Sequence, residues 1–129
     1  MIGLIATVHA LGCRANPRDD DFARRFIDNV RRDDSAGALQ LQPNSVISDS
    51  GWIKIVRIFQ PTMPRGVPDT VRIIEWENGT MPTMGAYRKL TYEVQRADTA
   101  SKVQLWLVGP DSQTYVSALK IGLWRVSPQ

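Results

Sequence analysis

The chain has 129 residues, 43% of them hydrophobic and 22% charged, a balance typical of one globular domain and unlike that of disordered chains. The formal net charge of +3 comes from basic residues scattered along the chain, whereas a nucleic-acid interface concentrates them on one face, so we expect no nucleic-acid partner. A single cysteine excludes an internal disulfide and a multi-cysteine zinc site, and we expect neither a metal nor another cofactor.

The first segment of the chain is apolar. Residues 1–12 contain no Lys, Arg, Asp or Glu, and charge begins at Arg14. The segment is too short to cross a bilayer, which takes about 20 apolar residues, but it has the length of the hydrophobic part of a signal peptide. Its end, where Gly12 precedes Cys13, resembles a bacterial lipoprotein signal. This resemblance implies that Cys13 is acylated and becomes the mature N-terminus.

Two other interpretations of this segment stay open. It is either a plain secretory signal, with a secreted or periplasmic product, or a buried N-terminal strand or helix with an inert cysteine. The division that we predict is a leader over residues 1–13 and one domain over residues 14–129.

A helix is predicted after Asn16-Pro17-Arg18, which we interpret as a short tether or turn. Its apolar residues recur at i, i+4, i+5 and i+8, the spacing of one helical face; they are Phe22, Phe26, Ile27 and Val30. Acids lie at its start, where they complement the helix dipole, and several are followed by an arginine four residues later. These pairs are Asp20/Arg24, Asp21/Arg25 and Asp28/Arg32. We interpret the acidic run Asp19-Asp20-Asp21 and its partners as a solvated helix face.

Two shorter helices are expected next. Residues 35–42 favour a short helix before Pro43. Ser48 is a suitable N-cap for a segment with an apolar stripe from Trp52 to Phe59, although the Ile and Val content of that segment also suits a strand. We prefer the helix, followed by a stiff proline-rich loop.

The apolar period changes to two after residue 69, which predicts strands. The expected strands are Val71–Glu77, Tyr87–Arg96, Lys102–Val108 and Tyr115–Val126. Their connections are shorter than the crossover that parallel strands need, so the strands should be antiparallel. Asn78-Gly79 is interpreted as a tight turn, and Gly122 suggests a bulge or bend in the last strand. Helices followed by such a meander indicate an α+β fold.

This order resembles the cone-shaped superfamily named after nuclear transport factor two. The resemblance lies in the leading helix from Phe22 to Asp34, the short helices, and the long antiparallel strands ending in Leu123–Val126. It implies N-terminal helices packed on a curved four-stranded antiparallel sheet that leaves a pocket. Members of the superfamily include isomerases, dehydratases, scaffold domains and secretion-system components, so the fold alone does not fix the function.

Aromatic residues on the predicted strands are the candidate pocket lining. They are Trp76, Tyr92, Trp106 and Trp124. They either line an apolar pocket on the concave face or form the core, which large aromatic residues usually do. Strand alternation places Tyr92 with a core-like set and Trp106 with polar neighbours, which makes Trp106 the better pocket candidate of those two.

Catalytic residues are hard to find in the domain. The only histidine, His9, lies in the leading segment, so a serine or cysteine nucleophile has no histidine partner. We therefore expect a non-catalytic binding or accessory module at the bacterial cell envelope, held to the membrane by the lipid anchor and taking a small apolar ligand or a protein partner on the concave face. The alternatives are a small enzyme of the isomerase or dehydratase kind and a structural subunit of a secretion apparatus or phage particle.

Overall fold

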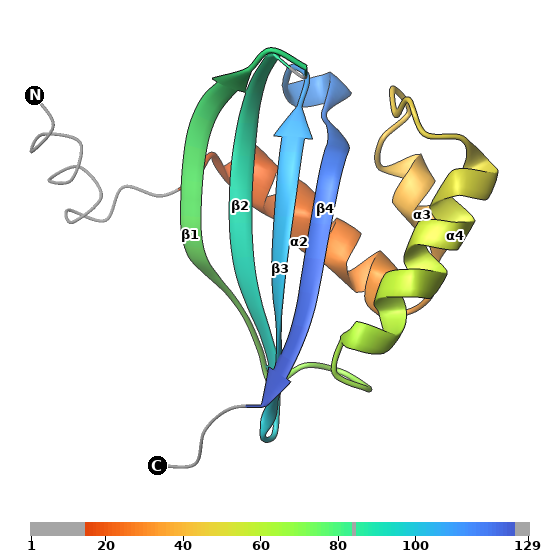
Figure 1. Cartoon of the computed structure of the whole chain (residues 1–129), viewed down its shortest axis with the longest axis vertical. Coiled ribbons are helices and arrows are strands. Elements are labelled where there is room, and N and C mark those ends of the chain that lie inside the picture. Colours follow the sequence, from red (N-terminus) through yellow and green to blue (C-terminus); the bar gives the residue numbers. More distant parts are fainter. Residues whose placement is uncertain (1–14, 84, 126–129) are drawn as a thin grey trace, which may run out of the picture.

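The computed structural model describes residues 15–83 and 85–125 (Figure 1). Cys13 and the predicted leader lie outside these residues. Helices come first: α2 (Pro17–Arg31), α3 (Ser35–Gln40), α4 (Asp49–Phe59) and a 3₁₀ turn, η1 (Gln60–Thr62). One antiparallel sheet follows, with the strand order β1-β2-β3-β4. The strands are β1 (Thr70–Met81), β2 (Gly85–Arg96), β3 (Thr99–Val108) and β4 (Tyr115–Arg125), with a 3₁₀ turn, η2 (Asp111–Gln113), before β4. The predicted α+β class and antiparallel meander are confirmed.

Both long helices begin at a capping residue, and α2 begins at Pro17, within the segment expected to be a tether or turn. The Asn16 side chain accepts a hydrogen bond from the Arg18 backbone N–H at 2.8 Å, and Pro17 opens α2, as proline can because its missing N–H is not needed there. The Ser48 hydroxyl accepts from the Gly51 N–H at 3.2 Å, so the segment from residue 49 is a helix and the competing strand interpretation is wrong. The predicted acid–arginine pairs of α2 form at 3.0–3.1 Å.

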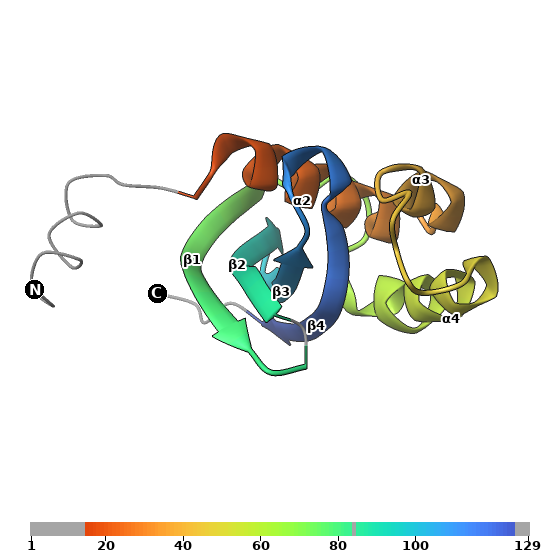
Figure 2. The same cartoon turned by 90° about the horizontal axis from the view of Figure 1, so that it is seen from above.

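The helices cover one face of the sheet. Figure 2 shows α2 running across this face, with α3 and α4 beside β4. Leu90, Tyr92 and Val94 of β2 point to the helices and are fully buried. In the centre of the helical layer, the rings of Phe26 and Trp52 meet edge to face with centroids 5.4 Å apart. The core therefore lies between α2, α4 and this face of the sheet.

The opposite face of the sheet is polar. Lys89 of β2 pairs across the ladder with Trp106 of β3, and the Lys89 ammonium lies 5.1 Å from the centre of that indole ring. Four residues further along β2, Glu93 pairs with Lys102 and also accepts a hydrogen bond from Arg72 of β1 at 2.8 Å. Trp106 is therefore on the side of the sheet that faces away from the helices.

Two predictions about glycines in the sheet differ from the structure. Asn78-Gly79 is not a turn: β1 continues to Met81, and the turn lies at residues 82–83. Gly79 instead pairs with Tyr87, and the Tyr87 ring lies across the glycine. A Cβ at Gly79 would come within 2.6 Å of the Tyr87 Cζ. Gly122 carries no bulge, since the ladder runs through its pairing with Lys102 without a register shift.

The buried hydroxyl of Tyr92 makes the stability of the fold depend on pH above about pH 10. It donates to the Asp20 carboxylate at 2.5 Å, and burial, followed by the interaction with Asp20, raises the pKa of Tyr92 far above 10.0. A phenol in the unfolded chain ionises near pH 10. Because the folded pKa is the higher one, this contribution to stability is complete below pH 10 and is lost as the pH rises further.

We therefore expect the Tyr92→Phe variant to depend less steeply on alkaline pH. Above about pH 10 the wild type should lose up to about 1.4 kcal/mol per pH unit more than the variant, the slope for one ionising group. Urea unfolding at pH 7, 9 and 11 measures this difference. Equal slopes for the two proteins would mean that Tyr92 is not held neutral by the fold.

Candidate functional site

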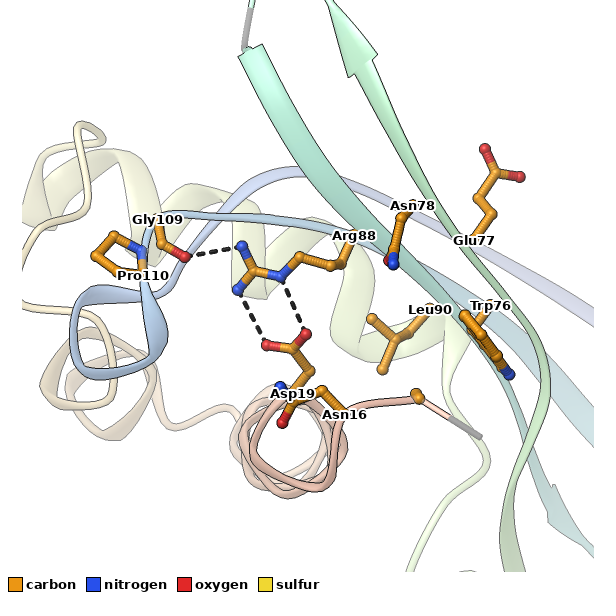
Figure 3. A pocket seen from close by; sticks show the side chains of 10 residues that line it. Asn16, Asp19, Trp76, Glu77, Asn78, Arg88, Leu90, Gly109 and Pro110 are labelled. Atoms are coloured by element: carbon orange, nitrogen blue, oxygen red, sulfur yellow. Dashed lines mark hydrogen bonds and ion pairs between the residues drawn. The ribbon is translucent and has the colours of Figure 1, made fainter. Parts of the chain in front are cut away.

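A pocket of about 380 Å³ lies between the start of α2, the β1–β2 pair and the connection from β3 to β4 (Figure 3). Its lining residues are Ala15, Asn16, Asp19, Trp76, Glu77, Asn78, Arg88, Leu90, Gly109 and Pro110. The register of the sheet explains the wall contributed by the strands, because Trp76 pairs with Leu90 and Asn78 pairs with Arg88. These side chains share the face of the sheet that α2 covers.

A bulge in β1 brings Trp76 to this face. Ile73 pairs with Tyr92, but Glu75 pairs with the next residue along β2, so Ile74 is an extra residue in β1. An extra residue shifts the alternation by one position and turns the following side chains to the other face. Trp76 therefore faces the same way as Ile73, although the two are three residues apart in sequence.

A buried ion pair forms the back of the pocket. Arg88 Nε and Nη2 each donate to the Asp19 carboxylate, on Oδ2 and Oδ1, at 3.0 Å. Arg88 also donates from Nη1 to the Gly109 carbonyl at 2.7 Å and from Nη2 to the Thr114 hydroxyl at 3.1 Å. Only 4% of the Asp19 side chain is exposed. The guanidinium thus joins α2, β2 and the β3–β4 connection at one point.

The expectation that Asp19 belongs to a solvated helix face is wrong. A signal for its burial was present, because Asp19 precedes Ala23, Phe26 and Val30 by four, seven and eleven residues and so continues their apolar stripe. Arg88 likewise continues the alternation of the core residues of β2. The pairing itself joins residues 69 positions apart, which local patterns do not reveal.

Gly109 closes the pocket in a conformation that other residues rarely adopt. Its φ is +91°, and a Cβ there would lie 2.5 Å from the backbone carbonyl oxygen of Gln113. We expect Gly109→Ala to cost about 1–3 kcal/mol of unfolding free energy, through backbone strain and displacement of the carbonyl that Arg88 binds. Thermal and urea unfolding measure the loss.

The matched control for that change is Gly122→Ala. Gly122 is exposed, and a Cβ there would meet no atom within 4 Å, so the stability should stay within about 0.5 kcal/mol of the wild type. If both alanine variants are equally stable, the geometry at Gly109 is not required.

The predicted aromatic residues separate in the structure. Trp76 lines the pocket, whereas Tyr92 is fully buried in the core. Trp106 is half-buried on the opposite face of the sheet. Trp124 pairs with Ala100 in the ladder, but its side chain, like all of Cys13, lies outside what the structure describes. Trp76, Tyr92 and Trp106 therefore do not meet in one cavity, and the residues that accompany Trp76 are Asp19, Arg88 and their neighbours.

The charged side chains of the pocket are already engaged in hydrogen bonds. Both Asp19 oxygens accept hydrogen bonds from Arg88. The Glu77 side chain points away from the ion pair (Figure 3) and accepts a hydrogen bond from the Tyr87 hydroxyl at 3.2 Å. The lining also includes Trp76, which is half-buried, and two exposed asparagines, Asn16 and Asn78.

Residues 15–83 and 85–125 contain neither of two other kinds of site. These residues contain no group of three or more His, Cys, Asp or Glu side chains placed to hold a metal ion. None of their helices has both the length and the apolar character needed to cross a membrane. Comparison of the chain with protein-family models, with curated proteins and with solved structures found no match.

Proposed function

We propose that this protein is a non-catalytic binding module of the bacterial cell envelope, and that its ligand occupies the pocket beside Trp76. In this proposal the sheet and helices form the cone that the resemblance to the nuclear transport factor two superfamily implies, and the pocket opens on its concave face. The observation that carries the proposal is the saturated ion pair. Asp19 and Arg88 make a rigid polar wall next to an indole, which preorganises the pocket without leaving a reactive group.

The same observation argues against the isomerase or dehydratase alternative. Such an enzyme needs a side chain that exchanges a proton with the substrate, within hydrogen-bond reach of it. The carboxylates that line this pocket are Asp19, which Arg88 engages on both oxygens, and Glu77, whose side chain is turned away. A binding function therefore fits the pocket better than acid–base catalysis does.

The ligand that fits is a small amphiphile with a hydrogen-bond acceptor. The Trp76 ring, which is half-buried, gives the pocket an apolar wall. The Asn16 side-chain oxygen already accepts from the Arg18 N–H, which leaves its NH₂ group to donate, and the Asn78 side chain is exposed at the rim. An apolar body with one carbonyl or similar oxygen would satisfy both the ring and the amide donors.

Chain geometry connects this pocket to the proposed anchor. Ala15 is part of the pocket lining, and Cys13 precedes it by two residues. Two residues span at most about 7 Å, so a lipid on Cys13 would hold the pocket beside the membrane surface. A membrane-derived amphiphile would then reach the pocket directly.

The pocket is tested with the neutral aromatic probe N-phenyl-1-naphthylamine, whose fluorescence rises in an apolar site. We expect saturable binding to the wild type and its loss in Asn78→Trp, because the larger side chain fills the pocket from its exposed rim. The control is Glu75→Trp, which adds the same ring on the polar face of the same strand and should bind the probe normally. Equal binding by the two tryptophan variants would refute the proposed site.

The anchor is tested separately by the intact mass of the protein extracted from membranes of the cells that make it. A species that begins at Cys13 and carries added acyl mass is the expected result. More than one acyl chain should be present, because a single chain anchors only marginally. An unmodified chain that begins at Met1 would exclude the anchor and would favour the structural-subunit alternative.

A further inference from the structure

A second cleft lies at the opposite end of the sheet from the pocket beside Trp76. It has a volume of about 370 Å³ and lies between the turn after α4 and the β2–β3 hairpin, which adjoin at the lower end of Figure 1. The residues that line it are Pro61, Met63, Pro64, Arg65, Arg96, Ala97 and Thr99. Met63 and Pro64 are buried and give the cleft an apolar floor. Of the described lining residues, only Arg65 and Arg96 carry charge.

A backbone carbonyl holds the Arg96 guanidinium at this cleft, and no described carboxylate forms an ion pair with it. Its Nη1 donates to the Val67 carbonyl at 2.8 Å. The guanidinium lies against Gly66, where the φ is +79° and a Cβ would come within 2.5 Å of the Arg96 Nη1. From the other side of this loop, Arg31 Nη1 donates to the Gly66 carbonyl at 3.3 Å. The loop thus positions the Arg96 charge while leaving it unneutralised by any ion pair with a described residue.

Arg65 adds a second guanidinium with its full hydrogen-bonding capacity. It is exposed, and no hydrogen bond or ion pair joins it to another described residue. The two nearby acids, Asp69 before β1 and Asp98 in the hairpin, each accept a hydrogen bond from a hairpin residue. Asp69 accepts from the Ala97 N–H at 2.8 Å, and Asp98 accepts from the Thr99 hydroxyl at 3.3 Å. Neither acid is among the residues that line the cleft.

We infer that this cleft binds a soluble organic anion. The carboxylate or phosphate group lies between the guanidiniums of Arg65 and Arg96, whose planar donors match the oxygens of such groups. The apolar part of the ligand rests on Met63 and Pro64. This site is independent of the pocket beside Trp76, because it uses other residues at the other end of the sheet. The same chemistry is present in anionic lipid headgroups, so the experiment must separate the two sources.

The test is titration of the ¹⁵N-labelled wild-type protein with phenyl phosphate, followed by amide chemical shifts. We expect saturable shifts at residues 61–67 and 96–99, with a Kd of about 1 mM for so small a ligand. Arg65→Ala should bind roughly tenfold more weakly, because it loses a charge-assisted hydrogen bond. Arg57→Ala removes the same charge from an exposed position on α4 and should bind as the wild type does.

Several results would overturn the inference. Benzyl alcohol should cause no saturable shift, and equal binding of this neutral compound would mean that the arginines do not recognise the ligand. Shifts that are as large with Arg65→Ala as with the wild type would have the same meaning. Binding to phosphatidylglycerol vesicles without any response to phenyl phosphate would assign the cleft to a lipid surface, which contradicts a soluble ligand.

Discussion

Replacing Arg88 with methionine should destabilise the protein by about 3–5 kcal/mol, because the buried Asp19 carboxylate would lose both of its hydrogen-bond donors. The Gly109 carbonyl and the Thr114 hydroxyl would lose their Arg88 donor as well. A small domain has only about 5–15 kcal/mol of stability in total, so the loss is a large part of it. Urea unfolding followed by circular dichroism measures the difference.

Two control variants separate the cost of leaving the buried Asp19 charge unpaired from the cost of removing an arginine. Arg72→Met removes an arginine that pairs with Glu93 but whose own side chain is 66% exposed, and it should cost less than about 1 kcal/mol. The double variant Asp19→Leu/Arg88→Met removes both charges and should recover most of the stability, as apolar replacement of a buried pair often does. A single variant as stable as the Arg72 control would show that Asp19 is not buried in solution.

Trp52→Ala is expected to have a similarly large effect, a loss of about 3–5 kcal/mol. Trp52 is 1% exposed and packs edge to face on Phe26, so its removal leaves a cavity between α2 and α4. Its indole N–H also donates to the Ser45 hydroxyl at 2.9 Å. Thermal unfolding and urea unfolding both report the loss.

The matched control lies on the same helix. Ile58 is 66% exposed, and Ile58→Ala should change the stability by no more than about 0.5 kcal/mol. Trp52→Phe keeps much of the packing but lacks the hydrogen bond to Ser45. Its loss of stability should therefore fall between those of Trp52→Ala and Ile58→Ala. If Trp52→Ala costs no more than Ile58→Ala, α4 does not pack on α2 as described.

The elements of the fold were predictable because their signals are local. The stripe from Phe22 to Val30, the cap at Ser48 and the alternation from residue 87 onwards each depend on neighbours in sequence, and each element forms as expected. The error at Asn78-Gly79 has a non-local cause. A strand partner, Tyr87, covers the glycine and extends β1 past the position where the dipeptide favours a turn.

The pocket was less predictable than the fold because it depends on contacts between distant segments. Trp76 reaches it through the bulge at Ile74, which no glycine or proline marks in the sequence. Asp19 and Arg88 carry the signal of burial, since each lies on an apolar face of its own element, but only the packing of α2 on β2 brings them together. Strand assignment alone therefore grouped Trp76 with Tyr92 and Trp106, which line other parts of the molecule.

The most direct test of the proposed ligand pocket is to identify what the protein carries when it is purified, without denaturation, from the cells that make it. Mass spectrometry of the material released on unfolding should find one small amphiphile in roughly stoichiometric amount with the wild type. The variant with a filled pocket, Asn78→Trp, should release none, and Arg65→Ala should release the wild-type amount. Identical material from the wild type and Asn78→Trp, or no bound molecule in any of the three preparations, would contradict a ligand site beside Trp76.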